Sequence, residues 1–134
     1  MRIMTWNVEN LFLPGSGDGP ADQDTFDAKL DALETVLRAL VPDVVALQEI
    51  GSPEAPGALR DRVADLGYKD PVESSLPDSR GIRVAFLSRL PVVGDAVEVS
   101  VFPPDIDPVQ VSDSEDPAER TTDRMGRGAL EITV

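Results

Sequence analysis

The chain has no cysteine and no histidine. Without cysteine it cannot form a disulfide framework, a thiolate metal site or a cysteine nucleophile. Histidine is the side chain that most often transfers protons at neutral pH, so its absence excludes the commonest form of general acid-base catalysis within this sequence. Hydrolytic chemistry would have to rely on carboxylates and a metal ion, or on a part that these 134 residues lack.

Basic residues are also scarce. Lysine and arginine number 12 against 25 aspartates and glutamates, which gives a formal net charge of −13. A chain with this charge repels a polyanion unless a local basic patch or bound cations intervene. The composition therefore disfavours a nucleic-acid ligand.

Long hydrophobic runs are missing as well. No stretch of 18 apolar residues occurs, and the short apolar run at the N-terminus is broken at Asn7, so it does not resemble a signal-peptide core. We therefore expect a cytoplasmic protein with no membrane segment. Its 134 residues, 41% of them apolar, are enough to build one domain over residues 1–134.

The first 50 residues predict a strand, a helix and a second strand. Residues 2–8 alternate with a period of two, as in a strand packed on both faces. In residues 24–41 apolar side chains recur at helical spacing, with Asp24 as the expected N-cap and Pro42 as the stop. Residues 43–50 form a short buried strand with a polar tip. The apolar positions of the helix are Phe26, Leu30, Leu33, Leu37 and Leu40.

These three elements form a βαβ unit, whose two strands run parallel because the helix carries the chain back across the sheet. Asn7 and Glu49 both fall near the carboxyl ends of these strands. Open α/β sheets bind their ligands at that edge. We therefore expect Asn7 and Glu49 to lie together at a binding site, with Glu9 and Asn10 in the solvated loop beside it.

The middle of the chain predicts two further units. Residues 59–67 are expected to form a second helix that ends at Gly67. Residues 82–86 and 97–101 both alternate with a period of two, and a turn lies between them. This pattern is typical of an antiparallel hairpin.

The last 32 residues divide into two parts. Residues 103–126 are rich in proline and acidic residues, which predicts a long, mobile, solvated loop. Residues 126–134 alternate again and predict a final strand with no evident partner, which would leave an exposed edge.

Four segments of the sequence resemble the endonuclease/exonuclease/phosphatase superfamily, the deoxyribonuclease I-like phosphodiesterases and phosphatases. The resemblance implies an α/β fold, a four-layered α/β/β/α sandwich with a mixed sheet and flanking helices, of which this chain matches the N-terminal half. The segments are TWNVENLF at 5–12, PDVVALQEI at 42–50, RGIRVAFLSRLPV at 80–92 and GRGALEITV at 126–134.

The resemblance also implies a chemistry. Glu49 matches the family's metal-binding carboxylate, and Asn7 matches the active-site asparagine that helps to bind phosphate and to orient the surroundings of the metal. Both are predicted catalytic and metal-site residues, with Mg²⁺ or Mn²⁺ as cofactor. The substrate would be a phosphoester, either nucleic acid or a small phosphodiester or phosphomonoester. Arg80 and Arg89 are expected near a phosphate, without a catalytic role.

The family's remaining catalytic motifs, an Asp-x-Asn triplet and a terminal Ser-Asp-His, have no match in this sequence. We therefore expect a truncated N-terminal portion of a metal-dependent phosphoester hydrolase that is inactive by itself and lacks its C-terminal half. One alternative is a non-catalytic binding or interaction module, or a half-domain completed by a partner chain. A second is an acidic structural protein without a site, if the motifs are coincidental.

Overall fold

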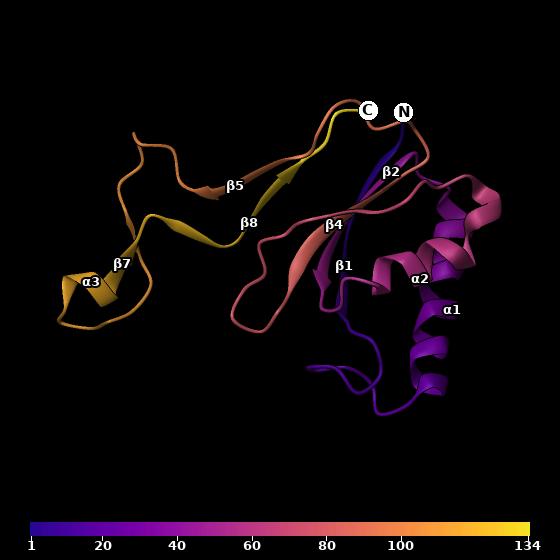
Figure 1. The fold of residues 1–134 in the computed structure, drawn as a ribbon, viewed down its shortest axis with the longest axis horizontal. Helices are drawn as coiled ribbons and strands as arrows, with labels where there is room; N and C mark the ends of the chain where they lie inside the picture. Colours follow the sequence, from indigo (N-terminus) through magenta and orange to yellow (C-terminus); the bar gives the residue numbers. More distant parts are fainter.

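A four-stranded mixed sheet forms the centre of the computed structural model, which describes residues 1–134 apart from the side chain of Pro117. Helices lie beside the sheet, and a separate strand pair extends away from it (Figure 1). This mixed sheet with flanking helices confirms the predicted fold class. In order across the sheet, the strands are β1 (Ile3–Leu11), β2 (Val44–Ile50), β4 (Arg83–Ser88) and β3 (Val72–Glu73).

The predicted βαβ unit is confirmed. β1 and β2 pair in parallel, and the helix α1 (Gln23–Leu40) connects them. The helix begins two residues earlier than expected, because the N-cap is Asp22 rather than Asp24, and the Asp22 carboxylate accepts a hydrogen bond from the backbone N–H of Thr25 at 2.8 Å. At its other end Val41 adopts a left-handed conformation, with φ 44°, before Pro42.

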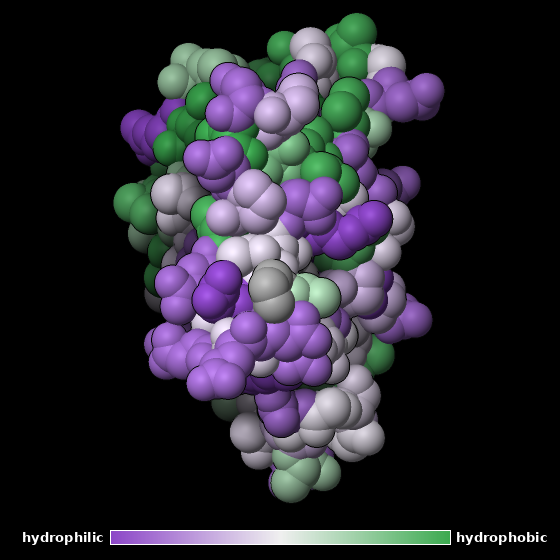
Figure 2. Space-filling view, turned by 90° about the vertical axis from the view of Figure 1, so that its left-hand side faces the viewer, coloured by the Kyte–Doolittle hydropathy of each residue, from purple (hydrophilic) through white to green (hydrophobic). Residues whose placement is uncertain are grey.

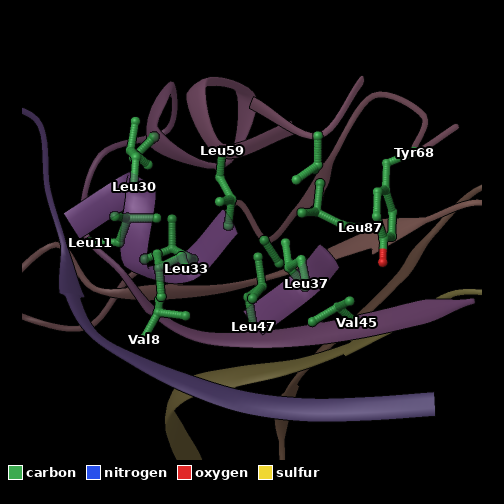
Figure 3. Close-up of a cluster of buried hydrophobic side chains, with 14 of the residues drawn as sticks. Val8, Leu11, Leu30, Leu33, Leu37, Val45, Leu47, Leu59, Tyr68 and Leu87 are labelled. Carbon is green, nitrogen blue, oxygen red and sulfur yellow. The ribbon is translucent and has the colours of Figure 1, made fainter. Parts of the chain in front are cut away.

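The core lies between α1 and one face of the sheet. Leu37 of α1 lies beside Val45 and Leu47 of β2, while Leu30 and Leu33 lie near Leu11 and Val8 of β1 (Figure 3). Leu40, the last apolar position predicted for the helix, is instead 45% exposed, because it lies in the final turn beyond the sheet contact. Burying a leucine side chain stabilises a fold by about 1.5–3 kcal/mol, so this contact holds the βαβ unit together.

The second helix begins and ends earlier than the predicted 59–67. α2 (Ala55–Arg62) ends where Val63 leaves helical geometry, and the 3₁₀ turn η1 (Ala64–Leu66) follows it. Gly67 then closes the segment in the left-handed region, with φ 86°, which glycine adopts without strain. The predicted end of the helix at Gly67 is therefore wrong, because α2 stops before Val63 and Gly67 ends the 3₁₀ turn instead.

The predicted hairpin is wrong. β4 lies between β2 and β3, so both of its edges are already occupied. β5 (Val97–Val101) pairs instead with β8 (Arg124–Glu131), which gives the final strand a partner that we did not expect. A period-two pattern identifies a strand and its faces but contains no information about which edge it joins.

The acidic segment contains more structure than predicted. β6 (Val109–Gln110) pairs with β7 (Thr121–Thr122), and α3 (Pro117–Arg120) precedes β7. The prediction of an uninterrupted loop over 103–126 is therefore wrong, because short β-branched stretches lie among the acidic residues and prolines. Figure 2 views the end of the molecule that carries α3 and β7, and hydrophilic residues cover the middle of that face. None of the described helices combines the length and the hydrophobicity that a membrane span requires.

The core packing gives a direct test. Leu37 is fully buried and Leu40 lies on the same helix. Replacing Leu37 with alanine should lower the free energy of unfolding by about 2–5 kcal/mol, because it leaves a cavity between α1 and the sheet. Leu40→Ala should change it by less than about 0.5 kcal/mol. Urea unfolding followed by circular dichroism measures both, and equal losses in the two variants would contradict this packing.

Candidate functional site

The structure brings Asn7 and Glu49 to the same edge of the sheet. Asn7 is paired with Gln48, the residue before Glu49. The backbone N–H of Asn10 donates a hydrogen bond to Glu49 Oε2 at 3.2 Å, which connects the two strands at this point. The parallel pairing of β1 with β2 is the cause, since it places both carboxyl ends side by side.

Both strands bulge here. The register between β1 and β2 shifts between Asn7 and Leu11, and the register between β2 and β4 shifts at Glu49. Glu9, Asn10 and Glu49 all have positive φ angles, of 54°, 58° and 64°. A bulge redirects the side chain of the extra residue. This explains how the carboxylate of Glu49 can point toward the end of the strands where Asn10 lies.

The structure does not have the loop that we expected after Asn7. β1 continues to Leu11, so Glu9 and Asn10 belong to the bulged strand rather than to a loop. The ammonium group of Lys29, from α1, donates hydrogen bonds to the carbonyl oxygens of Glu9 and Asn10. Left-handed conformations of residues other than glycine cost about 1–3 kcal/mol each and cluster at functional sites. Three of them at one edge therefore mark this edge as a candidate site.

The amide of Asn7 has a defined orientation. Its Oδ1 accepts a hydrogen bond from the backbone N–H of Glu9 at 2.8 Å. Its Nδ2 makes no hydrogen bond within the described residues and is the group left to meet a ligand. Because Nδ2 is a donor, Asn7 is suited to a phosphate oxygen, and its oxygen is already engaged.

A second group of charges comes from the turn before β4 and from β8. Arg127 Nε donates to Asp78 Oδ2 at 2.8 Å, and Arg127 Nη1 lies 4.0 Å from Glu49 Oε1. Arg80 reaches Asp18 Oδ2 at 2.6 Å and Asn10 Oδ1 at 3.2 Å. Sequence reasoning did not select Asp78 or Arg127. Arg127 belongs to β8, which is far from Glu49 in the sequence. The only feature of the sequence that could have indicated it is a charged residue between two glycines.

Arg89 lies elsewhere. It follows β4, which runs antiparallel to β2, so it sits at the opposite end of the sheet beside Val44. Its guanidinium contacts Asp43 and the carbonyl oxygen of Leu66. Of the two arginines expected near a phosphate, the structure places only Arg80 at the edge with Glu49.

Burial and hydrogen bonding shift two pKa values at the site. Burial tends to raise the pKa of Asp78, but its hydrogen bonds with Arg127 and with the backbone N–H groups of Ile82 and Arg80 outweigh this and hold the pKa below its ordinary value. Burial lowers the pKa of Lys29, while the charges of Glu9 and Glu49 oppose that shift. Asp78 is therefore held in its charged form.

The donor set limits what could bind a metal. Within the described residues, no group of three or more acidic side chains is arranged to hold an ion. Glu49 is 22% exposed and has one oxygen, Oε2, bonded to Asn10, while Oε1 has Arg127 at 4.0 Å. Mg²⁺ usually keeps several waters and takes one or two carboxylates together with a substrate phosphate. A single carboxylate with an accessible oxygen fits that pattern.

A hollow of about 310 Å³ lies beside the site, between the outer edge of β1 and α1. Asn7, Glu9 and Lys29 form its polar rim, and Trp6 and Leu33 are among its apolar lining. Its volume is at the lower end of the range of small-molecule sites. Asn7, Glu9 and Lys29 are therefore accessible to a ligand of modest size, whereas Glu49 does not line this hollow.

Comparison with known proteins identifies relatives of this chain. The model of the Endonuclease/Exonuclease/phosphatase family matches residues 4–124. A crystal structure of an endonuclease/exonuclease/phosphatase from Beutenbergia cavernae DSM 12333 is 29% identical, with a TM-score of 0.49 over 75% of this chain and 28% of that one. ANGEL2, a 2′,3′-cyclic phosphatase, is 18% identical, with a TM-score of 0.46 over 60% of this chain and 24% of its own.

The chain thus spans about a quarter of the length of these two solved structures. No curated protein matches it.

The strained bulge predicts a stabilising substitution. Glu9→Gly should raise the free energy of unfolding by about 1 kcal/mol, because glycine adopts φ 54° without strain. Glu54→Gly is the matched control, since Glu54 has φ −81° and glycine relieves nothing there. Urea unfolding compares the two. Equal destabilisation of both variants would show that the bulge is not strained in solution.

The lowered pKa of Asp78 predicts a pH dependence. A carboxyl group whose pKa is lower in the folded state stabilises the fold above its unfolded pKa of about 3.9 and loses this effect as the pH falls through the folded pKa. Asp78→Asn should therefore be less stable than the parent at pH 7, and the difference should shrink below about pH 4. Urea unfolding between pH 7 and pH 3 measures it, with the exposed Asp105→Asn as control. A difference independent of pH would contradict this assignment.

Proposed function

The chain belongs to the endonuclease/exonuclease/phosphatase family, and from that premise we propose that its bulged sheet edge is the metal- and phosphate-binding part of a phosphoester hydrolase. The observation that carries the proposal is the meeting of Asn7 and Glu49 on two adjacent bulges, inside the matched residues 4–124. The family match supports the reaction class, and the local geometry supports the assignment of roles.

Glu49 is the proposed ligand for Mg²⁺ or Mn²⁺. Its left-handed backbone directs the carboxylate away from the ladder, and the N–H of Asn10 holds one oxygen in place. The other oxygen then has a fixed position from which to bind. A divalent ion, when bound, polarises a phosphoryl oxygen and offsets the negative charge that develops on the leaving group.

Asn7 and Arg80 are proposed to orient the phosphate. Asn7 Nδ2 is a neutral donor whose direction is fixed by the bond between its Oδ1 and Glu9. Arg80 bridges Asp18 in the preceding loop and Asn10 in the bulge, so its charge lies at the rim of the same edge. Neither residue is placed to transfer a proton, since an amide and a guanidinium do not titrate near neutral pH.

The proton transfers of hydrolysis therefore need groups other than these. We propose that the chain acts as the N-terminal portion of the catalytic domain and binds the ion and phosphate without turning substrate over by itself. The absence of histidine from these 134 residues supports this, because histidine is the side chain that most often transfers protons at neutral pH. The net charge of −13 favours a small phosphoester over a polyanionic nucleic acid as substrate. A non-catalytic phosphate-binding module is the second candidate, because the same groups would bind metal and phosphate and the sequence contains no histidine.

Metal binding by Glu49 is directly testable. Glu49→Gln keeps the size and the acceptor for the Asn10 N–H but removes the charge, so Mn²⁺ affinity should fall by about tenfold or more. Isothermal titration calorimetry with Mn²⁺ measures the affinity, and Glu54→Gln, in an exposed position on α2's N-terminus, is the matched control. An unchanged affinity in Glu49→Gln would rule out this ligand.

A further inference from the structure

We propose that Lys29 is a positioning residue of this site, which acts from α1 through the backbone of β1 to hold the Glu49 carboxylate in place for a metal ion. The inference rests on the proposed function, because the ion would be the one that Glu49 binds. From the sequence, Lys29 is one of the polar residues of a predicted helix and carries no functional signal.

The ammonium group of Lys29 binds β1 at the two residues that form its bulge. Its Nζ donates hydrogen bonds to the carbonyl oxygens of Glu9 and Asn10, the latter at 3.4 Å. The carbonyl oxygen of Asn10 also accepts a hydrogen bond from the N–H of Phe12 at 3.0 Å. Glu9 and Asn10 are in the left-handed region, with φ 54° and 58°. One side chain thus connects the helix to two successive carbonyl groups of the strained backbone.

A single peptide group lies between Lys29 and Glu49. The carbonyl oxygen of Glu9 and the N–H of Asn10 belong to the same peptide bond, which is planar and trans, so the two groups point in opposite directions. Lys29 holds the oxygen at one end, and the N–H at the other end donates to Glu49 Oε2 at 3.2 Å. Fixing the carbonyl group therefore fixes the direction of the N–H that holds the carboxylate. A cation at the oxygen also polarises the peptide group and strengthens its N–H as a donor.

The helix supplies a rigid base for Lys29. Phe26 and Leu33 lie three positions before it and four positions after it, and both are buried against the sheet. Residues at these spacings share one side of a helix, so the stem of Lys29 is directed toward β1. Within the described residues its ammonium group forms no ion pair, and its hydrogen bonds go to the two carbonyl oxygens. Its charge is therefore used on the backbone of the bulge.

The charge of Lys29 allows a positioning role to be separated from a simple electrostatic one. Burial lowers the pKa of Lys29, and the negative charges of Glu9 and Glu49 oppose that shift, so the lysine and Glu49 interact electrostatically. A cation that only stood near Glu49 would repel a divalent ion, and its removal would strengthen metal binding. Removal of a positioning residue weakens metal binding instead. The two roles therefore predict changes of opposite sign.

The test is the Mn²⁺ affinity of the 134-residue chain, measured by isothermal titration calorimetry. Lys29→Met keeps an apolar stem but removes the donor and the charge, and we expect Mn²⁺ affinity to fall about tenfold, as when a group that orients a metal ligand is lost. Lys69→Met is the matched control, because Lys69 is exposed and its backbone N–H bonds to Ser88, which lies opposite Val44 at the other end of the sheet. This control should bind Mn²⁺ as the parent does.

The backbone amide of Asn10 gives a spectroscopic readout that needs no metal. Its proton resonance should shift in Lys29→Met, because the peptide group loses its contact with the lysine, and it should stay in place in Lys69→Met. Nitrogen–proton NMR spectra measure both. An Asn10 amide that does not move in Lys29→Met would overturn the inference.

Lys29→Gln removes the same charge but keeps an N–H donor of shorter reach, so Mn²⁺ affinity should fall by less than in Lys29→Met. This variant decides the question if circular dichroism shows that Lys29→Met does not fold. Affinity equal to or above that of the parent in a folded Lys29 variant would overturn the inference, and an equal fall in Lys69→Met would do the same. In either case, loss of Mn²⁺ affinity in Glu49→Gln leaves the proposed function standing. Mn²⁺ binding that survives Glu49→Gln would overturn the proposed function instead.

Discussion

β1 and β2 run parallel because the amphipathic helix α1 returns the chain across one face of the sheet, and the meeting of Asn7 with Glu49 depends on that pairing. From Ile3 opposite Val44 to Asn7 opposite Gln48, the two strands keep one register. The buried leucines of α1 hold the strands together from below. Two residues 42 positions apart in sequence, Asn7 and Glu49, therefore meet at one edge.

That edge departs from regular sheet geometry. In a regular strand, the alternation of side chains between the two faces of the sheet would fix the direction of the Glu49 side chain. The bulge instead adds one residue to β2, and the backbone of Glu49 adopts the left-handed conformation. The cost is offset by hydrogen bonds that cross the bulge, from Asn10 to Glu49 and from Lys29 to the carbonyl oxygens of the bulge. The packing under α1 supplies the stability that makes this strain tolerable.

Local pattern was sufficient to predict the elements near the site. The period of the apolar residues predicted α1 and the strands on either side of it, and the polar ends of those strands predicted the positions of Asn7 and Glu49. Pairing over long distances was not predictable in the same way. β4 and β5 have the same alternation as the two strands of a hairpin, yet β4 joins β2 and β3, and β5 joins β8. Arg127 lies on β8 and reaches the edge only because β8 pairs with β5. The sequence pattern around Arg127 therefore did not indicate a role for it.

Whether the bulged edge is where a divalent ion binds can be seen directly in the parent chain. Mn²⁺ broadens the NMR signals of nearby backbone amides, and the acidic segment at 103–126 is the rival location because it concentrates carboxylates. This account predicts that broadening at low Mn²⁺ begins at residues 7–10 and 48–50 and spares Arg89 at the opposite end of the sheet. Broadening that begins within 103–126 and leaves Glu49 sharp would contradict it.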